Sequence, residues 1–149
     1  MKLTRSVIAS VAIGLSCAPA LAGLGGDVPS VEADRASLKG ALHITSAASY
    51  AVHEINSSDG MRVHEYVSPA GKVFAVSWRG AGIPDLRQML GSYYEEFAQA
   101  TSQPHYNHHQ LSVQTANVVV QSSGHARAFF GRAWVPALLP QNFAANDIN

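Results

Sequence analysis

The spacing of apolar residues along the chain predicts both helices and strands. Between residues 83 and 97, apolar side chains recur every three or four positions, which is typical of an amphipathic helix. The stripe consists of Ile83, Leu86, Met89, Leu90, Tyr93, Tyr94 and Phe97. Pro84 suits the first turn of this helix. A second, shorter helix is predicted from Ser30 to Leu42, with Ser30 as its N-cap.

Five other segments have the alternation and composition of β-strands. They are residues 50–55, 61–67, 73–78, 111–121 and 126–135. Three-residue turns ending in glycine separate the first three strands and the last two, as a type I turn with a bulge requires. The predicted order is therefore α-β-β-β-α-β-β. This order favours an α+β fold, in which the main amphipathic helix packs on one face of an antiparallel sheet of about five strands.

The turn type also predicts which residues face each other in the first two hairpins. Glu54 is expected to face His64, and His53 to face Glu65. In the second hairpin, His64 is expected to face Val76. Alternation then predicts the side chains on the core face of the sheet. That face holds Val52, Tyr66, Phe74, Val76 and Trp78, together with Glu54 and His64. His53 and Glu65 are expected to form a surface pair on the opposite face.

The first 22 residues have the features of a secretory signal peptide. Lys2 and Arg5 precede an uncharged, mostly apolar run over residues 7–15, and residues 20–22 have the small-x-small pattern of a cleavage site. The apolar run is too short to span a membrane. Cleavage near Ala22 would leave one globular domain, residues 23–149, with a loose tail after its last strand. We expect this domain in the periplasm or secreted.

Composition narrows the chemistry of this domain. The only cysteine, Cys17, lies within the signal, so the exported domain would have neither a disulfide nor a thiolate ligand. Loss of Lys2 and Arg5 leaves eight basic and ten acidic residues. No basic block survives, which argues against a nucleic-acid partner. No second long apolar run follows, so we expect no transmembrane segment in the exported domain.

Glu54 and His64 are the first candidate functional pair. A carboxylate facing an imidazole could act as the general acid and base of a small hydrolase-like enzyme. The alternative is an ordinary cross-strand pair, which contributes about 0.2–1 kcal/mol to stability. The sequence contains neither a Gly-x-Ser-x-Gly nor a His-Glu-x-x-His motif.

Two further clusters could bind a metal ion or a partner. His105, His108 and His109 could hold Zn²⁺ or Cu²⁺ weakly, and the alternative is a solvated polar loop. No other cofactor is expected. Arg127, Arg132 and Trp134 are residue types favoured at protein interfaces. The alternative for the two arginines is ordinary exposed positions on a strand.

Several motifs distributed over most of the chain occur together. They are Val52-His53-Glu54, the stretch from Glu65 to Trp78, Pro84-Asp85-Leu86, Leu90-Gly91-Ser92-Tyr93, Gly124-His125-Ala126-Arg127-Ala128-Phe129 and Gly131-Arg132-Ala133. These motifs resemble a family of small exported proteins of Gram-negative bacteria that is classed only as a domain of unknown function. The resemblance implies export, and it carries no activity, cofactor or catalytic residue.

These observations together favour a non-enzymatic binding or interaction module in the periplasm. The chain lacks the common catalytic motifs, and a meander of strands exposes sheet edges to which a partner strand could add. The sequence does not identify the partner, and an envelope protein is one candidate.

Overall fold

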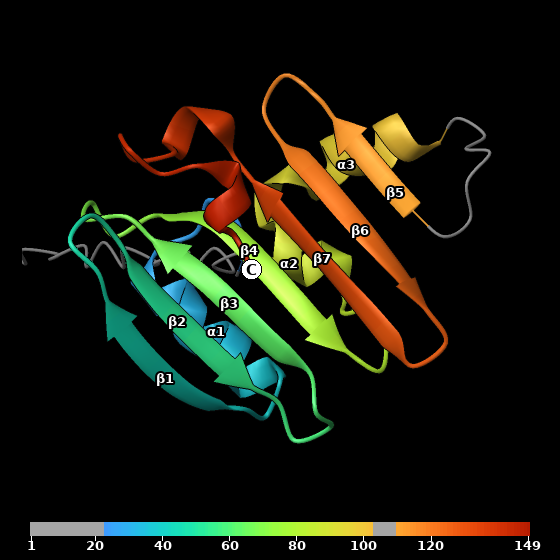
Figure 1. Ribbon diagram of the computed structural model, residues 1–149, viewed down its shortest axis with the longest axis horizontal. Coiled ribbons are helices and arrows are strands. Elements are labelled where there is room, and N and C mark those ends of the chain that lie inside the picture. Colours follow the sequence, from blue (N-terminus) through green and yellow to red (C-terminus); the bar gives the residue numbers. More distant parts are fainter. Residues whose placement is uncertain (1–22, 103–109) are drawn as a thin grey trace, which may run out of the picture.

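The computed structural model describes residues 23–102 and 110–149. These residues form a seven-stranded antiparallel sheet with the strand order β1-β2-β3-β4-β7-β6-β5. The strands are β1 (Ala41–Ser46), β2 (Ala51–Asn56), β3 (Arg62–Val67), β4 (Val73–Gly80), β5 (Gln110–Gln114), β6 (Val119–His125) and β7 (Ala128–Trp134). Two meanders, β1–β4 and β5–β7, therefore meet where β4 pairs with β7 (Figure 1).

The helices lie behind this sheet in the view of Figure 1. They are α1 (Val28–Ser37), α2 (Leu86–Leu90) and α3 (Tyr94–Thr101), with the short 3-10 helix η1 (Gly91–Tyr93) between the last two. Buried side chains from helices and strands form one cluster on this side of the sheet. It includes Val31, Ile55, Val63, Val76, Trp78, Met89, Leu90 and Phe97. We call this side the back face and the opposite side the front face.

The predicted α+β fold with about five strands is wrong. The described residues contain seven strands and one main helical stretch of 16 residues, so the fold is mostly β. The first helix was expected to reach Leu42, yet β1 begins at Ala41, because Lys39 has a positive φ of 49° that ends the helix and turns the chain into the strand. The strand expected over 111–121 is divided by a tight turn, in which Thr115 N–H donates to the Val118 carbonyl.

Two other local predictions also differ from the structure. The predicted long helix is interrupted at Gly91, whose φ of 52° and ψ of −126° are incompatible with an α-helix and disfavoured for other residues. The last hairpin does not turn at Ser122-Ser123-Gly124. It turns at Ala126-Arg127, where Arg127 has a φ of 67°.

The register of the first hairpin is confirmed, since Glu54 faces His64 and His53 faces Glu65. The second hairpin differs, because an irregularity between Tyr66 and Val67 shifts its pairing. His64 therefore faces Ser77 instead of Val76.

This shift overturns the predicted division between the faces of the sheet. Val76 and Trp78 lie in the back-face cluster with Val63, whereas Tyr66 and Phe74 belong to a second cluster. His53 and Glu65, expected to form a surface pair, are buried.

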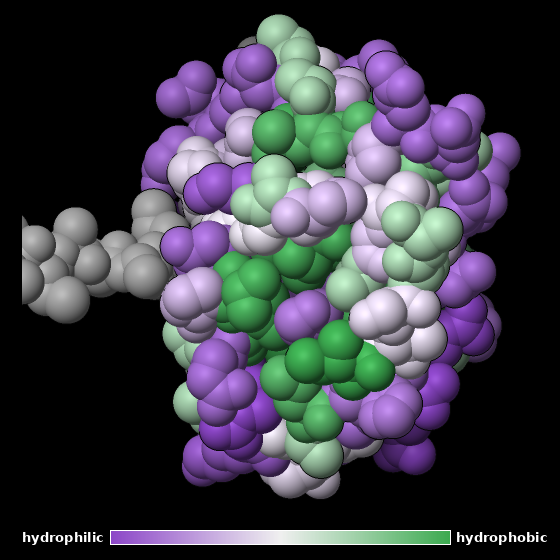
Figure 2. Space-filling view, turned by 90° about the vertical axis from the view of Figure 1, so that its left-hand side faces the viewer, coloured by the Kyte–Doolittle hydropathy of each residue, from purple (hydrophilic) through white to green (hydrophobic). Residues whose placement is uncertain are grey.

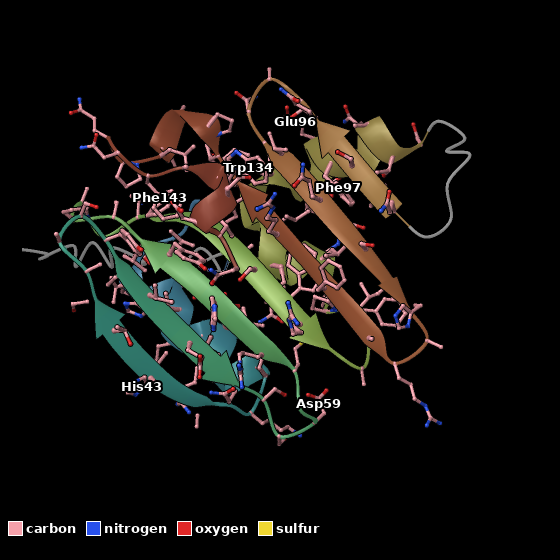
Figure 3. All side chains as sticks on the ribbon, in the orientation of Figure 1. His43, Asp59, Glu96, Phe97, Trp134 and Phe143 are labelled. Atoms are coloured by element: carbon pink, nitrogen blue, oxygen red, sulfur yellow. The ribbon has the colours of Figure 1, made fainter. Side chains whose placement is uncertain are left out.

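The C-terminal segment, residues 135–149, crosses the front face of the sheet (Figure 1). The tail was expected to be loose, yet Phe143 and Ile148 are buried against Tyr66, Phe74 and Trp134. Figure 3 shows Trp134 and Phe143 on this side. The Phe143 ring meets the Phe74 ring edge-on, with 4.9 Å between the centroids. Seen from the left of Figure 1, apolar residues gather in a central band between polar margins (Figure 2).

Candidate functional site

Side chains on the front face form rows that cross the strands of the described sheet. One row is polar on every strand, and we call it the polar row. From β1 to β5, it consists of His43, Glu54, His64, Ser77, Arg132, Gln121 and Ser112. The row on one side of it is mainly apolar and includes Val52, Tyr66, Ala75, Trp134 and Val119. Four of these, Tyr66, Ala75, Trp134 and Val119, are buried with the C-terminal segment, so the polar row lies at the margin of the covered part of the sheet.

Glu54 and His64 are in contact within the polar row. His64 Nε2 lies 2.9 Å from Glu54 Oε2, and Glu54 Oε1 accepts a hydrogen bond of 2.6 Å from Asn56 Nδ2. The hydrogen bonds from Asn56 and then His64 lower the pKa of Glu54. The pairing expected from the sequence is thus present, while an acid–base role for the pair remains a prediction.

The main-chain oxygen of Asn149 occupies a site formed by three donors. His64 Nδ1 lies 2.7 Å from it, and the Tyr66 and Ser77 hydroxyls each donate to it over 2.9 Å. The Tyr66 hydroxyl in turn accepts from the Asn149 N–H at 3.0 Å. Both ring nitrogens of His64 therefore lie within hydrogen-bonding distance of an oxygen atom of Asn149 or Glu54.

A groove of about 720 Å³ opens beside Asn149 on the front face. Its floor combines the polar row with the next row toward the β2–β3 hairpin. The lining residues are Arg62, His64, Ser77, Trp78, Arg79, Gln110, Leu111, Ser112, Gln121, Ser122, Ser123, Phe130, Gly131, Arg132, Ile148 and Asn149. Among these described lining residues there are three arginines and no carboxylate side chain, so the lining side chains carry a net positive charge.

Arg132 connects the groove to the C-terminal segment. Its Nη1 donates to the carbonyls of Ala145 and Ile148 over 2.9 and 3.4 Å, and its Nε donates to Gln121 Oε1 over 2.9 Å. Its guanidinium also lies 5.6 Å from the Trp134 ring. The structure thus brings together two of the three predicted partner-binding residues. The third, Arg127, lies in the turn between β6 and β7, outside the groove lining.

The sequence pattern missed a buried acidic pair on the back face. Glu65 and Asp34 are both fully buried, and Gln88 Nε2 donates to Asp34 Oδ1 over 2.6 Å. Burial, followed by the adjoining Asp34, raises the pKa of Glu65 to about 9, and burial also raises the pKa of Asp34. A protonated Glu65 that donates to Asp34 satisfies carboxyl oxygens that otherwise have no donor. The sequence does contain a signal for the burial of Glu65. This residue alternates with Val63 and Val67, so its side chain shares their face of the strand.

The proposed metal ligands His105, His108 and His109 lie outside the described residues. Within residues 23–102 and 110–149, no group of three or more His, Cys, Asp or Glu side chains is placed to hold a metal ion. In the same part of the chain, no helix has the length and apolar character needed to cross a membrane.

The fold and the groove define a mostly-β domain with an arginine-containing groove on the part of one sheet face that lies beside the C-terminal segment. The chain belongs to the family described as "Protein of unknown function (DUF2844)", which it matches over residues 20–148. The resemblance inferred from the motifs is thereby confirmed as membership of a domain family of unknown function. Searches among curated proteins and among solved structures found no match.

Proposed function

We propose that this protein is an exported, non-enzymatic binding module whose ligand lies in the groove beside Asn149. The observation that carries the proposal is the groove itself. Its volume of about 720 Å³ falls in the range of small-molecule sites, roughly 300–1,000 Å³. Rigid strands position its floor, and ligand sites on such elements hold their geometry well. Export rests on the signal-like sequence of residues 1–22.

The contacts of the polar row favour binding over catalysis. Both nitrogens of His64 and the hydroxyl of Ser77 are engaged with Glu54 or Asn149. These groups therefore stabilise the position of the C-terminal segment, which forms one wall of the groove through Ile148 and Asn149.

The proposal can be tested by native mass spectrometry of the full protein purified from its own cells. We expect a non-covalent adduct of small mass on the wild-type protein. Phe130→Glu places a carboxylate in the groove and should abolish the adduct. The matched control, Ile83→Glu, changes a similarly exposed apolar residue outside the groove and should retain it; the exposed fractions are 48% for Phe130 and 59% for Ile83. A wild-type protein without adduct, or an adduct that survives Phe130→Glu, would contradict the proposal.

A small hydrolase is the second candidate function, because the structure adds a hydroxyl to the predicted pair. Glu54, His64 and Ser77 are direct neighbours on β2, β3 and β4. In the observed arrangement, however, Ser77 Oγ donates to Asn149 and not to His64. A fluorophosphonate probe separates the two functions. Covalent labelling that is lost in Ser77→Ala would favour the hydrolase, and an unlabelled protein would favour the binding module.

A further inference from the structure

The arginines of the groove are arranged at an energetic cost. Arg62 and Arg79 are direct cross-strand partners on β3 and β4. Like charges in this position destabilise a sheet. Elsewhere in the described chain, Arg35 pairs with Glu32 and Arg87 with Glu95, whereas Arg127 in the β6–β7 turn also has no ion pair with a described carboxylate. The two groove arginines form no ion pair with a carboxylate of the described residues, which points to an anion supplied from outside.

The contacts of each groove arginine leave donors available. Arg62 Nε donates to Asn56 Oδ1 over 3.2 Å, and Arg62 acts on Glu54 only through its charge, since the Glu54 carboxylate is bonded to Asn56 and His64. The Arg79 guanidinium lies 5.7 Å from the Phe130 ring centroid. Arg132 uses Nε and Nη1 in its described contacts, so its Nη2 can donate to a ligand.

The positions of these arginines indicate how the negative charge of the ligand is distributed. The backbones of Arg62 and Arg79 lie on adjacent strands, about 5 Å apart. Arg132 is on the following strand and two residues farther along, which places it about 8 Å from Arg79. In the observed contacts, the Arg79 guanidinium lies against Phe130, whereas that of Arg132 lies against Trp134 and the Ala145 carbonyl, so the two point toward opposite ends of the groove. Two anionic groups on one molecule can engage both positions, and a guanidinium binds a carboxylate through two parallel hydrogen bonds.

An apolar surface lies between the cationic positions. Phe130 faces Arg79 across β4 and β7, and it is two residues from Arg132 on the same strand. Its ring is 48% exposed within the groove, which is large for a phenylalanine. A flat or ring-shaped ligand body would cover this surface and be held between the two ends of the groove.

We infer that the groove binds a small dicarboxylate whose apolar body packs on Phe130, with its carboxylates held by Arg62 and Arg79 at one end and Arg132 at the other. This inference rests on the proposed function and adds the chemical class of the ligand. It also assigns Arg62 and Arg79 a role in binding.

The test is calorimetric titration of the full-length protein with terephthalate, a ring with a carboxylate at each end. Benzoate carries one carboxylate and benzamide none, and both should bind more weakly in that order. Arg79→Gln should weaken terephthalate binding about tenfold or more, because it removes charge-assisted hydrogen bonds to a carboxylate. Arg127→Gln removes the same charge outside the groove and should leave binding unchanged.

A melting curve of the ligand-free variant shows whether Arg79 has a structural role. Relief of the Arg62–Arg79 repulsion predicts that Arg79→Gln melts at the same temperature as the wild type or higher. A lower melting temperature would indicate that Arg79 supports the fold, and it would count against the inference.

Three results would overturn the ligand class. They are terephthalate binding no tighter than benzamide, equal weakening by Arg79→Gln and Arg127→Gln, or inorganic phosphate binding as tightly as terephthalate. If terephthalate does not bind but the native adduct is still lost in Phe130→Glu, the proposed ligand class is wrong and the proposed binding function is retained. If the adduct is also absent, both proposals fail.

Discussion

Glu65 is an ionisable side chain fully buried in the back-face core, and replacing it isolates the effect of one proton on stability. Glu65→Gln nearly preserves the shape of the side chain, and the amide N–H can still donate to Asp34. The variant cannot ionise. Burial raises the pKa of Glu65 from its usual 4.5 to about 9, so the wild-type residue is protonated at neutral pH.

This pKa shift makes the free energy of unfolding depend on pH. Between pH 4.5 and 9, the folded protein holds a proton that the unfolded chain releases, so stability decreases as pH rises. The slope is about 1.4 kcal/mol per pH unit and becomes smaller near the folded-state pKa, which gives a loss of about 2 kcal/mol between pH 7 and 9. Burial lowers the pKa of His53, and that residue affects stability in the opposite direction only below about pH 6.5.

Urea unfolding followed by tryptophan fluorescence at pH 7, 8 and 9 measures this loss. We expect the wild-type midpoint to fall steadily and that of Glu65→Gln to stay nearly constant. Glu96→Gln is the control, because hydrogen bonds from Thr115 and Asn117 lower the pKa of Glu96, so its contribution is lost only at acid pH. A wild-type protein equally stable at pH 7 and 9, or a Glu65→Gln variant with the wild-type slope, would refute the reasoning.

Three further predictions concern the C-terminal segment, the main helix and the signal peptide. Phe143→Ala removes the ring that packs on Tyr50 and Phe74, and urea titration should show a loss of about 3 kcal/mol. Gly91→Ala forces a side chain into a conformation with φ of 52°, and differential scanning calorimetry should show destabilisation of about 1 kcal/mol or more; unchanged melting would contradict the assigned conformation. The intact mass of the protein from a periplasmic fraction should correspond to a chain that starts at Gly23, whereas an uncleaved mass would argue against the signal peptide.

The part of the candidate site that could be predicted from sequence is the part determined by local geometry. The turn after Ser57 places Ser57 opposite Met61, so alternation alone brings Glu54 to His64. The next hairpin has a similar turn, yet the irregularity at Tyr66 shifts its register by one residue. That single shift turns Val76 and Trp78 to the back face, and it brings Ser77 beside His64.

The groove could not be predicted, because its residues are far apart in the chain. Arg79 and Phe130 meet only where β4 pairs with β7, and this pairing joins two meanders that local patterns treat as separate. The contact of Asn149 with His64 likewise spans 85 residues. Alternation shows which residues share a face of the sheet, but it does not show which face the helices cover. The prediction from sequence therefore placed Glu65 on the surface.

The sequence by itself determined the family, the strands of the first hairpin and the facing of Glu54 and His64. Each of these depends on residues close together in the chain or on motifs that are matched directly. Tertiary structure decided which face of the sheet is buried, where the C-terminal segment lies and which arginines share a groove. Those outcomes depend on pairing between distant strands, in which a shift of one residue moves every following side chain to the opposite face.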